Sequence, residues 1–209
     1  MIGIVDYGMG NLHSVTKGLE RIGQTPFLSE NPAELAKADQ LILPGVGSFR
    51  DGMAELKKRG LDIFLKKWAA DEKPLLGICL GMQLLFDSSE ENGLTEGLGL
   101  LPGKAVRFSG EAKNGQRYKV PHMGWNRLTF NQPNHPILTD VPSGHVYFVH
   151  SYVVQVADPD ILIASSDYED LVPAVVGKGS VVATQFHPEK SSVLGMRILM
   201  NFVNQKGAE

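Results

Sequence analysis

The sequence predicts an α/β fold with three layers. A mostly parallel central sheet is flanked by helices, and additional antiparallel strands are expected in the C-terminal half. In the first half, short apolar runs alternate with segments whose apolar residues recur at helical spacing, which is typical of a parallel sheet with helices on both faces. After residue 93 glycines punctuate a loop, and strand-like segments dominate. The chain has 209 residues, a length that fits one large domain, and residues 1–209 are therefore expected to form a single domain.

The N-terminal elements are predicted from apolar patterning and turn residues. Buried strands are expected at residues 2–5, 40–43 and 75–78, each followed by a glycine-containing turn. Helices are expected from residue 12 to Gly23, a residue suited to ending a helix, and across the apolar stripe 61–68. Asn31 followed by Pro32 indicates another helix start. In such sheets functional groups collect at the carboxyl ends of the strands.

The C-terminal half is predicted to be rich in strands. They are expected at residues 104–108, 125–130, 145–156 and 161–165. Residues 175–182 indicate a hairpin with a glycine-containing turn. The last helix is expected from Ser192 to about Asn204, with Leu194, Ile198, Leu199 and Phe202 buried.

Composition excludes several classes of protein. A net charge of −3 gives no reason to expect nucleic acid or an anionic membrane as a partner. The single cysteine rules out an intrachain disulfide and multi-cysteine zinc, and the histidines lack a metal-binding spacing. No apolar run approaches the roughly 20 residues that span a bilayer, and no signal segment is recognisable. We therefore expect a cytoplasmic protein without metal or cofactor.

Cys79 lies where the strand at 75–78 is expected to turn into a helix with apolar residues through Phe86. Gly77 and Gly81 flank it at two residues on each side, which allows a sharp bend and close packing of helix on strand. This is the nucleophile-elbow pattern of α/β-hydrolases with sulfur in place of oxygen. A helix N-terminus would favour the thiolate. The alternative is a buried core cysteine.

His187 and Glu189 are the expected partners of the thiol. A cysteine nucleophile needs a base, and the base needs a third group to orient it. In an extended segment, side chains two residues apart point to the same side, so Glu189 would fix the tautomer of His187. The alternative is a strand-end histidine beside a solvated glutamate.

An anion hole is the remaining requirement. The backbone N–H of Leu80 follows the nucleophile, and a second donor is expected from the Pro44–Gly47 turn at Val46. The alternative is an ordinary strand-to-helix loop.

In combination, the Pro-Gly-Val-Gly turn at 44–47, Gly-Ile-Cys-Leu-Gly-Met-Gln at 77–83 and His-Pro-Glu at 187–189 resemble the motifs of class I glutamine amidotransferases, in their order. The resemblance implies glutamine hydrolysis through a thioester on Cys79, with His187 as base and acid and Glu189 as orienter. It also implies release of ammonia to a synthase partner. The glutamine-holding positions that it implies are Gly45, Gly47, Gln83, His150, Ser151 and Tyr152.

Finer motifs at 6–11, 121–126, 150–152 and 187–191 resemble the glutaminase subunits of imidazole glycerol phosphate synthase. That resemblance implies a heterodimer with a (β/α)8 cyclase subunit in histidine biosynthesis. Ammonia would pass to a phosphoribulosyl nucleotide, giving imidazole glycerol phosphate and an aminoimidazole carboxamide ribotide. The implied contact surface consists of Asn11, Met123, Trp125, Tyr147 and Lys190. Aromatic residues are enriched at such surfaces. Core packing of Trp125 and Tyr147, and helix capping by Asn11, are the alternatives.

Three other functions remain open from the sequence. The chain could be another class I glutaminase, such as one serving pyridoxal phosphate synthesis or a surface-sugar amidotransferase. It could be a free hydrolase of γ-glutamyl compounds, active alone, or a catalytically silent binding module. We expect hydrolysis to depend on the partner, since an isolated glutaminase would waste glutamine.

Overall fold

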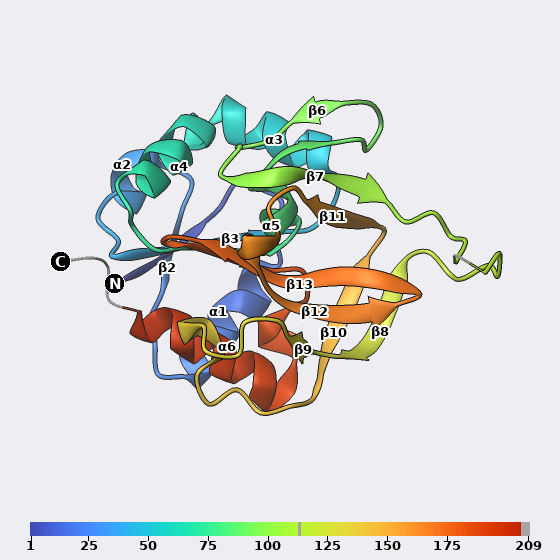
Figure 1. Ribbon diagram of the computed structural model, residues 1–209. Coiled ribbons are helices and arrows are strands. Elements are labelled where there is room, and N and C mark those ends of the chain that lie inside the picture. Colours follow the sequence, from blue (N-terminus) through green and yellow to red (C-terminus); the bar gives the residue numbers. More distant parts are fainter. Residues whose placement is uncertain (113, 206–209) are drawn as a thin grey trace.

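The computed structural model describes residues 1–112 and 114–205 and is built on a central sheet of eight strands (Figure 1). Their order is β2 (Phe27–Ser29), β1 (Ile2–Val5), β3 (Gln40–Gly45), β4 (Leu75–Cys79), β14 (Val181–Thr184), β13 (Asp170–Lys178), β12 (Leu162–Tyr168) and β9 (Thr129–Phe130). The first five strands pair in parallel, and the remaining pairings are antiparallel. The predicted α/β class is therefore confirmed.

Helices cover both faces of this sheet because its strands direct apolar side chains alternately to one face and the other. Ile42, Leu76 and Ile78 pack with α1 (Leu12–Arg21) and α6 (Ser192–Asn204). Leu41 and Leu75 point the other way, against α3 (Phe49–Lys58) and α4 (Leu61–Ala70). Figure 1 shows the two helical layers on opposite sides of the sheet. This alternation is the period-two pattern of a strand buried on both faces.

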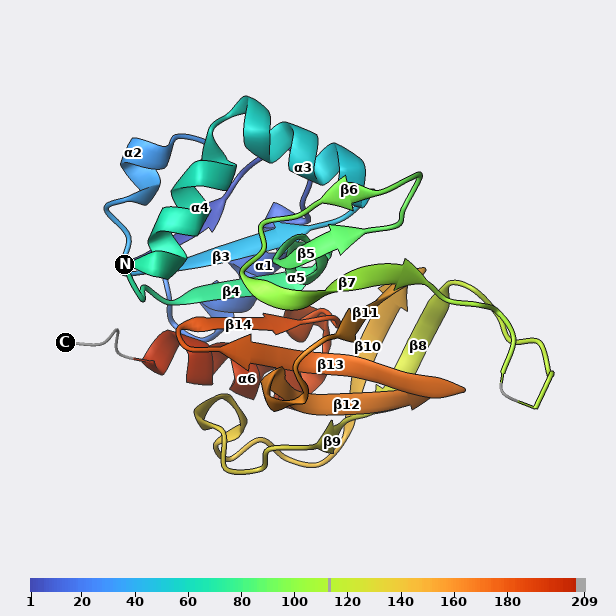
Figure 2. The ribbon, with the colours of Figure 1, turned by 45° about the horizontal axis from the view of Figure 1, so that its top comes forward.

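Two smaller sheets lie beside the carboxyl end of β4 (Figure 2). One pairs β10 (His145–His150) with β8 (His122–Arg127) in antiparallel fashion. The other has the order β11 (Tyr152–Val156), β7 (Leu101–Arg107), β5 (Phe86–Ser89) and β6 (Thr95–Glu96). Of the strands predicted for the second half, β7, β8, β10 and β11 lie in these sheets, whereas β9, β12, β13 and β14 belong to the central sheet. The two smaller sheets lie next to the end of the central sheet at which Cys79 is located.

Most predicted elements are present, with corrected boundaries. Helices α1, α4 and α6 occur as expected. Asn31 caps the short helix α2 (Pro32–Leu35), its side chain accepting from the N–H of Ala33. The strands expected at 125–130 and 145–156 are each broken, at Leu128 and Ser151. β3 extends through Pro44 and Gly45, which had been expected to form a turn. The elements β2 and α3 lie outside the predictions.

The helix after Cys79 is shorter than expected. α5 spans Leu80–Leu84, and Phe86 begins β5. The returning chain explains this end, since the N–H groups of Leu98, Leu100 and Gly99 donate to the carbonyls of Leu84, Leu85 and Phe86. Those carbonyls are thus taken by another segment rather than by a continuing helix. Tertiary pairing overrides the helical pattern here.

Among the residues that the structure describes, no helix has the length and apolar character needed to cross a membrane.

Candidate active site

Cys79 lies at a sharp turn between β4 and α5. Its backbone has φ 56° and ψ −112°, an unusual conformation for a residue with a side chain. A Cβ on Gly81 would collide with the carbonyl oxygen of Leu43, and one on Gly77 would lie 3.0 Å from the carbonyl oxygen of Gly81. The elbow geometry expected from the two glycines is therefore confirmed. Helix and strand approach this closely because neither glycine has a side chain.

His187 and Glu189 come together at the start of a different turn. The Nδ1 of His187 lies 2.9 Å from Oε1 of Glu189, and both side chains are buried. They are not in an extended segment, as the sequence interpretation assumed. His187 precedes a single 3₁₀ turn, η3 (Pro188–Lys190), that Pro188 initiates. This turn, rather than strand alternation, folds the carboxylate back onto the imidazole.

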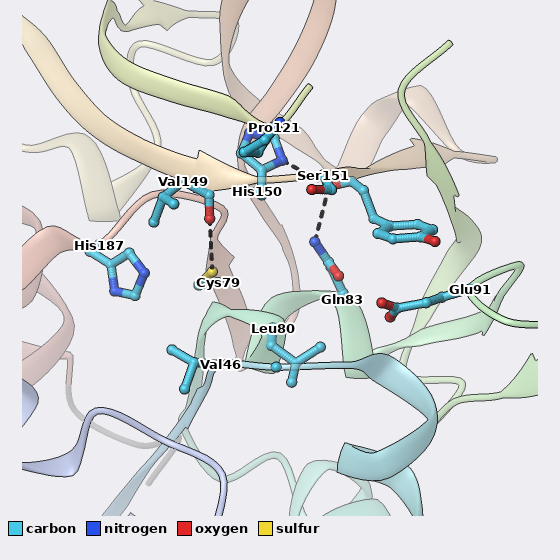
Figure 3. Close-up of a pocket in the computed structure, with 12 residues that line it drawn as sticks. Val46, Cys79, Leu80, Gln83, Glu91, Pro121, Val149, His150, Ser151 and His187 are labelled. Atoms are coloured by element: carbon cyan, nitrogen blue, oxygen red, sulfur yellow. Dashed lines mark hydrogen bonds between the residues drawn. The ribbon is translucent and has the colours of Figure 1, made fainter. Parts of the chain in front are cut away.

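The electrostatics of His187 suit a base beside a thiol. Burial alone would lower its pKa, but hydrogen bonding to Cys79 and Glu189, together with their charges, raises the pKa to about 9. Because the carboxylate accepts from Nδ1–H, Nε2 remains for the sulfur. Figure 3 shows the imidazole beside Cys79, whose sulfur faces the carbonyl of Val149. The pair can exchange a proton in the way nucleophilic catalysis requires.

A pocket of about 410 Å³ opens next to the sulfur (Figure 3). Its walls combine the elbow, the turn after β3, the segment at the β10–β11 junction and a glutamate of the loop after β5: Val46, Gly47, Cys79, Leu80, Gln83, Glu91, Pro121, Val149, His150, Ser151, Tyr152 and His187. This volume lies in the range of small-molecule sites. Of the glutamine-holding positions expected from the sequence, only Gly45 is not part of the wall. It is buried where a Cβ would meet the Tyr7 hydroxyl and the N–H of Gly81.

Three residues of the site had no signal in the sequence. Glu91 follows β5 and lines the pocket, and its carboxylate accepts from the N–H of Phe49 at 2.6 Å. Val149 contributes its main chain from β10. Gln185 is fully buried, and its amide nitrogen lies 3.9 Å from the sulfur of Cys79. Sequence spacing gives no hint of this arrangement, because separate elements bring Val149 and Gln185 to Cys79 and Glu91 to the pocket wall.

The expected anion hole is only half available. Leu80 begins α5, so its N–H lies in the first turn of the helix, which has no intrahelical partner. The N–H of Val46, in contrast, donates to the carbonyl of Met9 at 3.3 Å. The second donor proposed from the sequence is therefore committed elsewhere in this conformation. The turn between β3 and α3 would have to change to release it.

Buried imidazoles support one side of the pocket. His150 Nδ1 lies 2.8 Å from the carbonyl of Tyr152, and because a carbonyl only accepts, Nδ1 carries the proton. Its Nε2 lies 2.9 Å from Nδ1 of His122. Burial lowers the pKa of His150 to about 3, with the charges of His122 and His187 adding to the shift. His150 is thus a neutral, fixed part of the wall.

Three of the five expected partner-surface residues, Met123, Trp125 and Tyr147, lie on β8 and β10. Trp125 and Tyr147 are paired across the two strands, with ring centroids 5.8 Å apart. Trp125 is 53% exposed and Met123 is 60% exposed, which excludes core packing for both. Lys190 is exposed on η3. Asn11 caps α1, and its side chain accepts from the N–H of Ser14. Helix capping was the alternative to a partner contact for this residue.

Comparison with known proteins defines the class first. Residues 3–206 match the family described as "Glutamine amidotransferase class-I". A solved structure described as a glutamine amidotransferase aligns with a TM-score of 0.76, covering 99% of each chain, at 20% identity. At that identity the likeness concerns the fold. The family match covers nearly the whole chain, and the chain belongs to the class-I glutamine amidotransferases.

Two relatives narrow this further. The subunit HisH of imidazole glycerol phosphate synthase from Halalkalibacterium halodurans is 64% identical over 202 residues, which are 97% of this chain and 94% of the relative. The corresponding subunit from a Geobacillus species is 61% identical over 204 residues, 98% of this chain and 96% of the relative. Within its class, the chain belongs to this HisH family.

Proposed function

We propose that this chain is the glutaminase subunit of an imidazole glycerol phosphate synthase and hydrolyses L-glutamine to glutamate and ammonia in histidine biosynthesis. The observation behind the proposed chemistry is the convergence of Cys79, His187 and Glu189 at one pocket, although residue numbers 79 and 187 are far apart in the chain. Family membership and near full-length identity to synthase subunits support the pathway. All 209 residues are proposed to act as one domain.

The chemistry proceeds in two halves. The thiolate of Cys79 attacks the amide carbon, and His187 gives a proton to the departing nitrogen, so that the C–N bond breaks and ammonia leaves. A thioester joins the glutamyl group to sulfur. His187 then takes a proton from water, which adds to the thioester, and the C–S bond breaks to release glutamate and the thiol. Glu189 holds the imidazole in the tautomer that both halves need.

Substrate placement follows from the pocket walls. We assign the amino-acid end of glutamine to the polar groups around Gln83, His150, Ser151 and Tyr152. Gly47 is proposed to let the main chain approach the substrate closely. Gly45 has an indirect part, since its lack of a side chain lets β3 pack against the elbow. Leu80 and Val46 are the proposed donors of the anion hole. No cofactor or metal takes part in this scheme.

The partner is proposed to be the cyclase subunit, in a heterodimer that delivers ammonia directly to it. The products of the complex would be imidazole glycerol phosphate and an aminoimidazole carboxamide ribotide. The half-exposed Trp125, beside Tyr147 and Met123, supports a docking surface here, with Asn11 and Lys190 assigned to its edge. We place the complex in the cytoplasm, where an unpaired thiol stays reduced.

Hydrolysis is proposed to depend on that partner. The hydrogen bond from Val46 N–H to Met9 supports this dependence, because it withholds one anion-hole donor from the free chain. One such donor is worth on the order of 3 kcal/mol of transition-state stabilisation, or roughly a hundredfold in rate. Docking that breaks the bond would supply it.

The test is glutaminase activity of the chain alone, then with the cyclase subunit and its nucleotide ligand. We expect a rise of roughly a hundredfold or more on addition. Equal rates would overturn the dependence and favour a free γ-glutamyl hydrolase, while no activity in either state would favour a silent module. A rise with a different synthase would identify another amidotransferase, including a surface-sugar one.

Cys79→Ala supplies the control within the same assay. Glutamine-dependent synthesis by the complex should vanish, whereas synthesis from added ammonia should continue at the wild-type rate. Loss of both activities would assign Cys79 a structural role.

A further inference from the structure

Gln185 is a buried side chain directed at the sulfur of Cys79. It follows β14, and its main-chain N–H donates to the carbonyl of Ala174 at 2.9 Å. The side chain is fully buried, with Nε2 3.9 Å from the sulfur. A buried amide with a fixed orientation presents either a donor or an acceptor to its neighbour, with opposite effects on a thiol.

The orientation of this amide is determined by a chain of hydrogen bonds. The carbonyl of Tyr152 can only accept, so the group of Gln83 that lies 3.1 Å from it must be its NH₂. The same NH₂ donates to Gln185 Oε1 at 3.0 Å. With its oxygen held by Gln83, Gln185 must present NH₂ to Cys79. The polarity is thus set by a backbone carbonyl two side chains away from the sulfur.

A side-chain donor at this point matters because the main-chain neighbour of the sulfur is an acceptor. The carbonyl of Val149 lies 4.0 Å from the sulfur and accepts from the thiol, which favours the protonated form. Once the proton leaves, that carbonyl faces a negative charge. The N–H of Gln185 offers the ionised sulfur a hydrogen bond that the neutral thiol needs less.

We propose that Gln185 is a further catalytic residue, a buried amide donor that stabilises the Cys79 thiolate, and that Gln83 is the positioning residue that sets its polarity. The proposal rests on Cys79 being the nucleophile of the proposed function. It gives Gln83 a role behind the sulfur in addition to its place in the pocket wall.

The charge state of the sulfur also responds to other ionisable groups. His187 faces it from the turn after β14, with Glu189 behind the imidazole, and Tyr7 faces it from the end of β1. His150 and Glu91 line the same pocket. All five stay unchanged in the variants below, so differences between variants report on the two glutamines.

The test is the pH dependence of alkylation by iodoacetamide, measured on the full-length chain. Cys79 is its single cysteine, so the rate reports one thiol. We expect Gln185→Met to raise the midpoint of the pH–rate profile by about one pH unit, equivalent to a tenfold loss of thiolate below the midpoint. Gln185→Glu keeps the shape of the side chain and an oxygen that accepts from Gln83, but it places a second oxygen, an acceptor, at the sulfur. The midpoint of the pH–rate profile should therefore rise further in this variant than in Gln185→Met. Gln83→Met should give a smaller rise.

Gln40→Met is the matched control. Gln40 is also buried, and its amide donates to the carbonyls of Phe202, Val203 and Gln205. Its loss should lower the melting temperature and leave the midpoint unmoved. If Gln185→Met is too unstable to assay, the midpoints of the near-isosteric variant Gln185→Glu and of Gln83→Met test the proposal instead.

Folded Gln185 variants with the wild-type midpoint, or a lowered midpoint in Gln185→Glu, would overturn the proposal and leave Gln185 a packing residue. This readout involves no glutamine. Failure of the proposed function would appear separately, as wild-type protein that alkylates normally yet hydrolyses no glutamine with the cyclase subunit.

Discussion

Cys79 occupies a backbone conformation that persists only because its surroundings impose it. The parallel pairing of β4 with β3 and β14 holds one side, and α5 packs against β3 on the other. Gly81 permits that packing, since any Cβ there would strike the carbonyl of Leu43. At the scale of single residues, the backbone conformation of the proposed nucleophile therefore depends on the absence of a side chain at Gly81.

We expect Gly81→Ala to destabilise the fold by about 3 kcal/mol, the upper end for overpacking a core, and to abolish glutaminase activity. Chemical denaturation would measure the loss. Gly23→Ala is the control, because Gly23 has φ +79° and open space around it, so its cost is conformational, about 1 kcal/mol. Equal losses in the two variants would contradict the packing explanation.

Glu189→Gln tests the orienting carboxylate. The amide can turn its NH₂ toward His187 Nδ1, which stabilises the tautomer that cannot accept from Cys79. We expect glutamine-dependent kcat to fall about 10²–10⁴-fold in the complex. Synthesis from ammonia should be unaffected, and an unchanged glutamine-dependent rate would show that Glu189 does not orient the base.

At the scale of elements, Ser191 joins the strand β10 to the turn that bears His187. Its hydroxyl donates to the carbonyl of His187 at 2.7 Å and accepts from the N–H of Tyr147 at 3.0 Å. The N–H of His187 in turn donates to the Tyr147 carbonyl at 3.3 Å. Tyr147 faces Trp125 on the proposed docking surface. The proposed base and the proposed docking surface are thus both in contact with β10.

Ser191→Ala should cost about 1–3 kcal/mol, because it leaves the Tyr147 N–H without its partner and removes one of the two hydrogen bonds to the His187 carbonyl, which still accepts from the N–H of Lys190. Glutaminase kcat should fall as well, since the turn holding His187 loosens. Ser166→Ala is matched in burial but loses one hydrogen bond, to the carbonyl of Arg127. We expect it to reduce stability without changing kcat, and a similar kcat loss in both would refute the specific role of Ser191.

Elements with strong local signals were predictable. The caps at Asn31 and Gly23 and the apolar faces of α1, α4 and α6 follow from local sequence. The end of α5 at Leu84 did not, because β5 exists only where the distant segment 98–101 takes the carbonyls of residues 84–86. The breaks at Leu128 and Ser151 likewise reflect which sheet each flanking strand joins.

At the scale of the whole molecule, buried histidines make stability depend on pH. The pKa of His187 rises from 6.5 to about 9 on folding, so between those values the folded state binds more protons. Its contribution, up to about 3 kcal/mol, is present below pH 6.5 and lost as pH rises to 9. His150, with its pKa lowered to about 3, removes stability as pH falls below 6.5.

Urea denaturation from pH 4 to 10 would measure this dependence. We expect a maximum in the free energy of unfolding near pH 6.5. His187→Gln should flatten the alkaline side and keep the acid side. A wild-type curve that rises between pH 6.5 and 9 would contradict the raised pKa of His187.

The proposed partner surface makes a prediction about assembly. Trp125→Ala should weaken binding of the cyclase subunit by about 2 kcal/mol or more, roughly 30-fold in Kd, as expected for a central aromatic. Calorimetric titration would measure it. Ile63→Ala removes an apolar residue of α4 that is also exposed, at 72%, and its Kd should match the wild type. Equal Kd for both variants would place the interface elsewhere.

The sequence by itself determined the α/β class, the cysteine elbow and the His187–Glu189 pair, because each depends on residues close together in the chain. Tertiary structure decided what meets the sulfur. Val149 and Gln185 come from separate elements and reach the sulfur only once the sheets are assembled, and Glu91 reaches the pocket wall in the same way. Tertiary structure also decided that Val46 N–H bonds to Met9. Hydrogen-bond partners of a backbone group in a turn depend on which other loop lies beside it, and local sequence does not encode that neighbour.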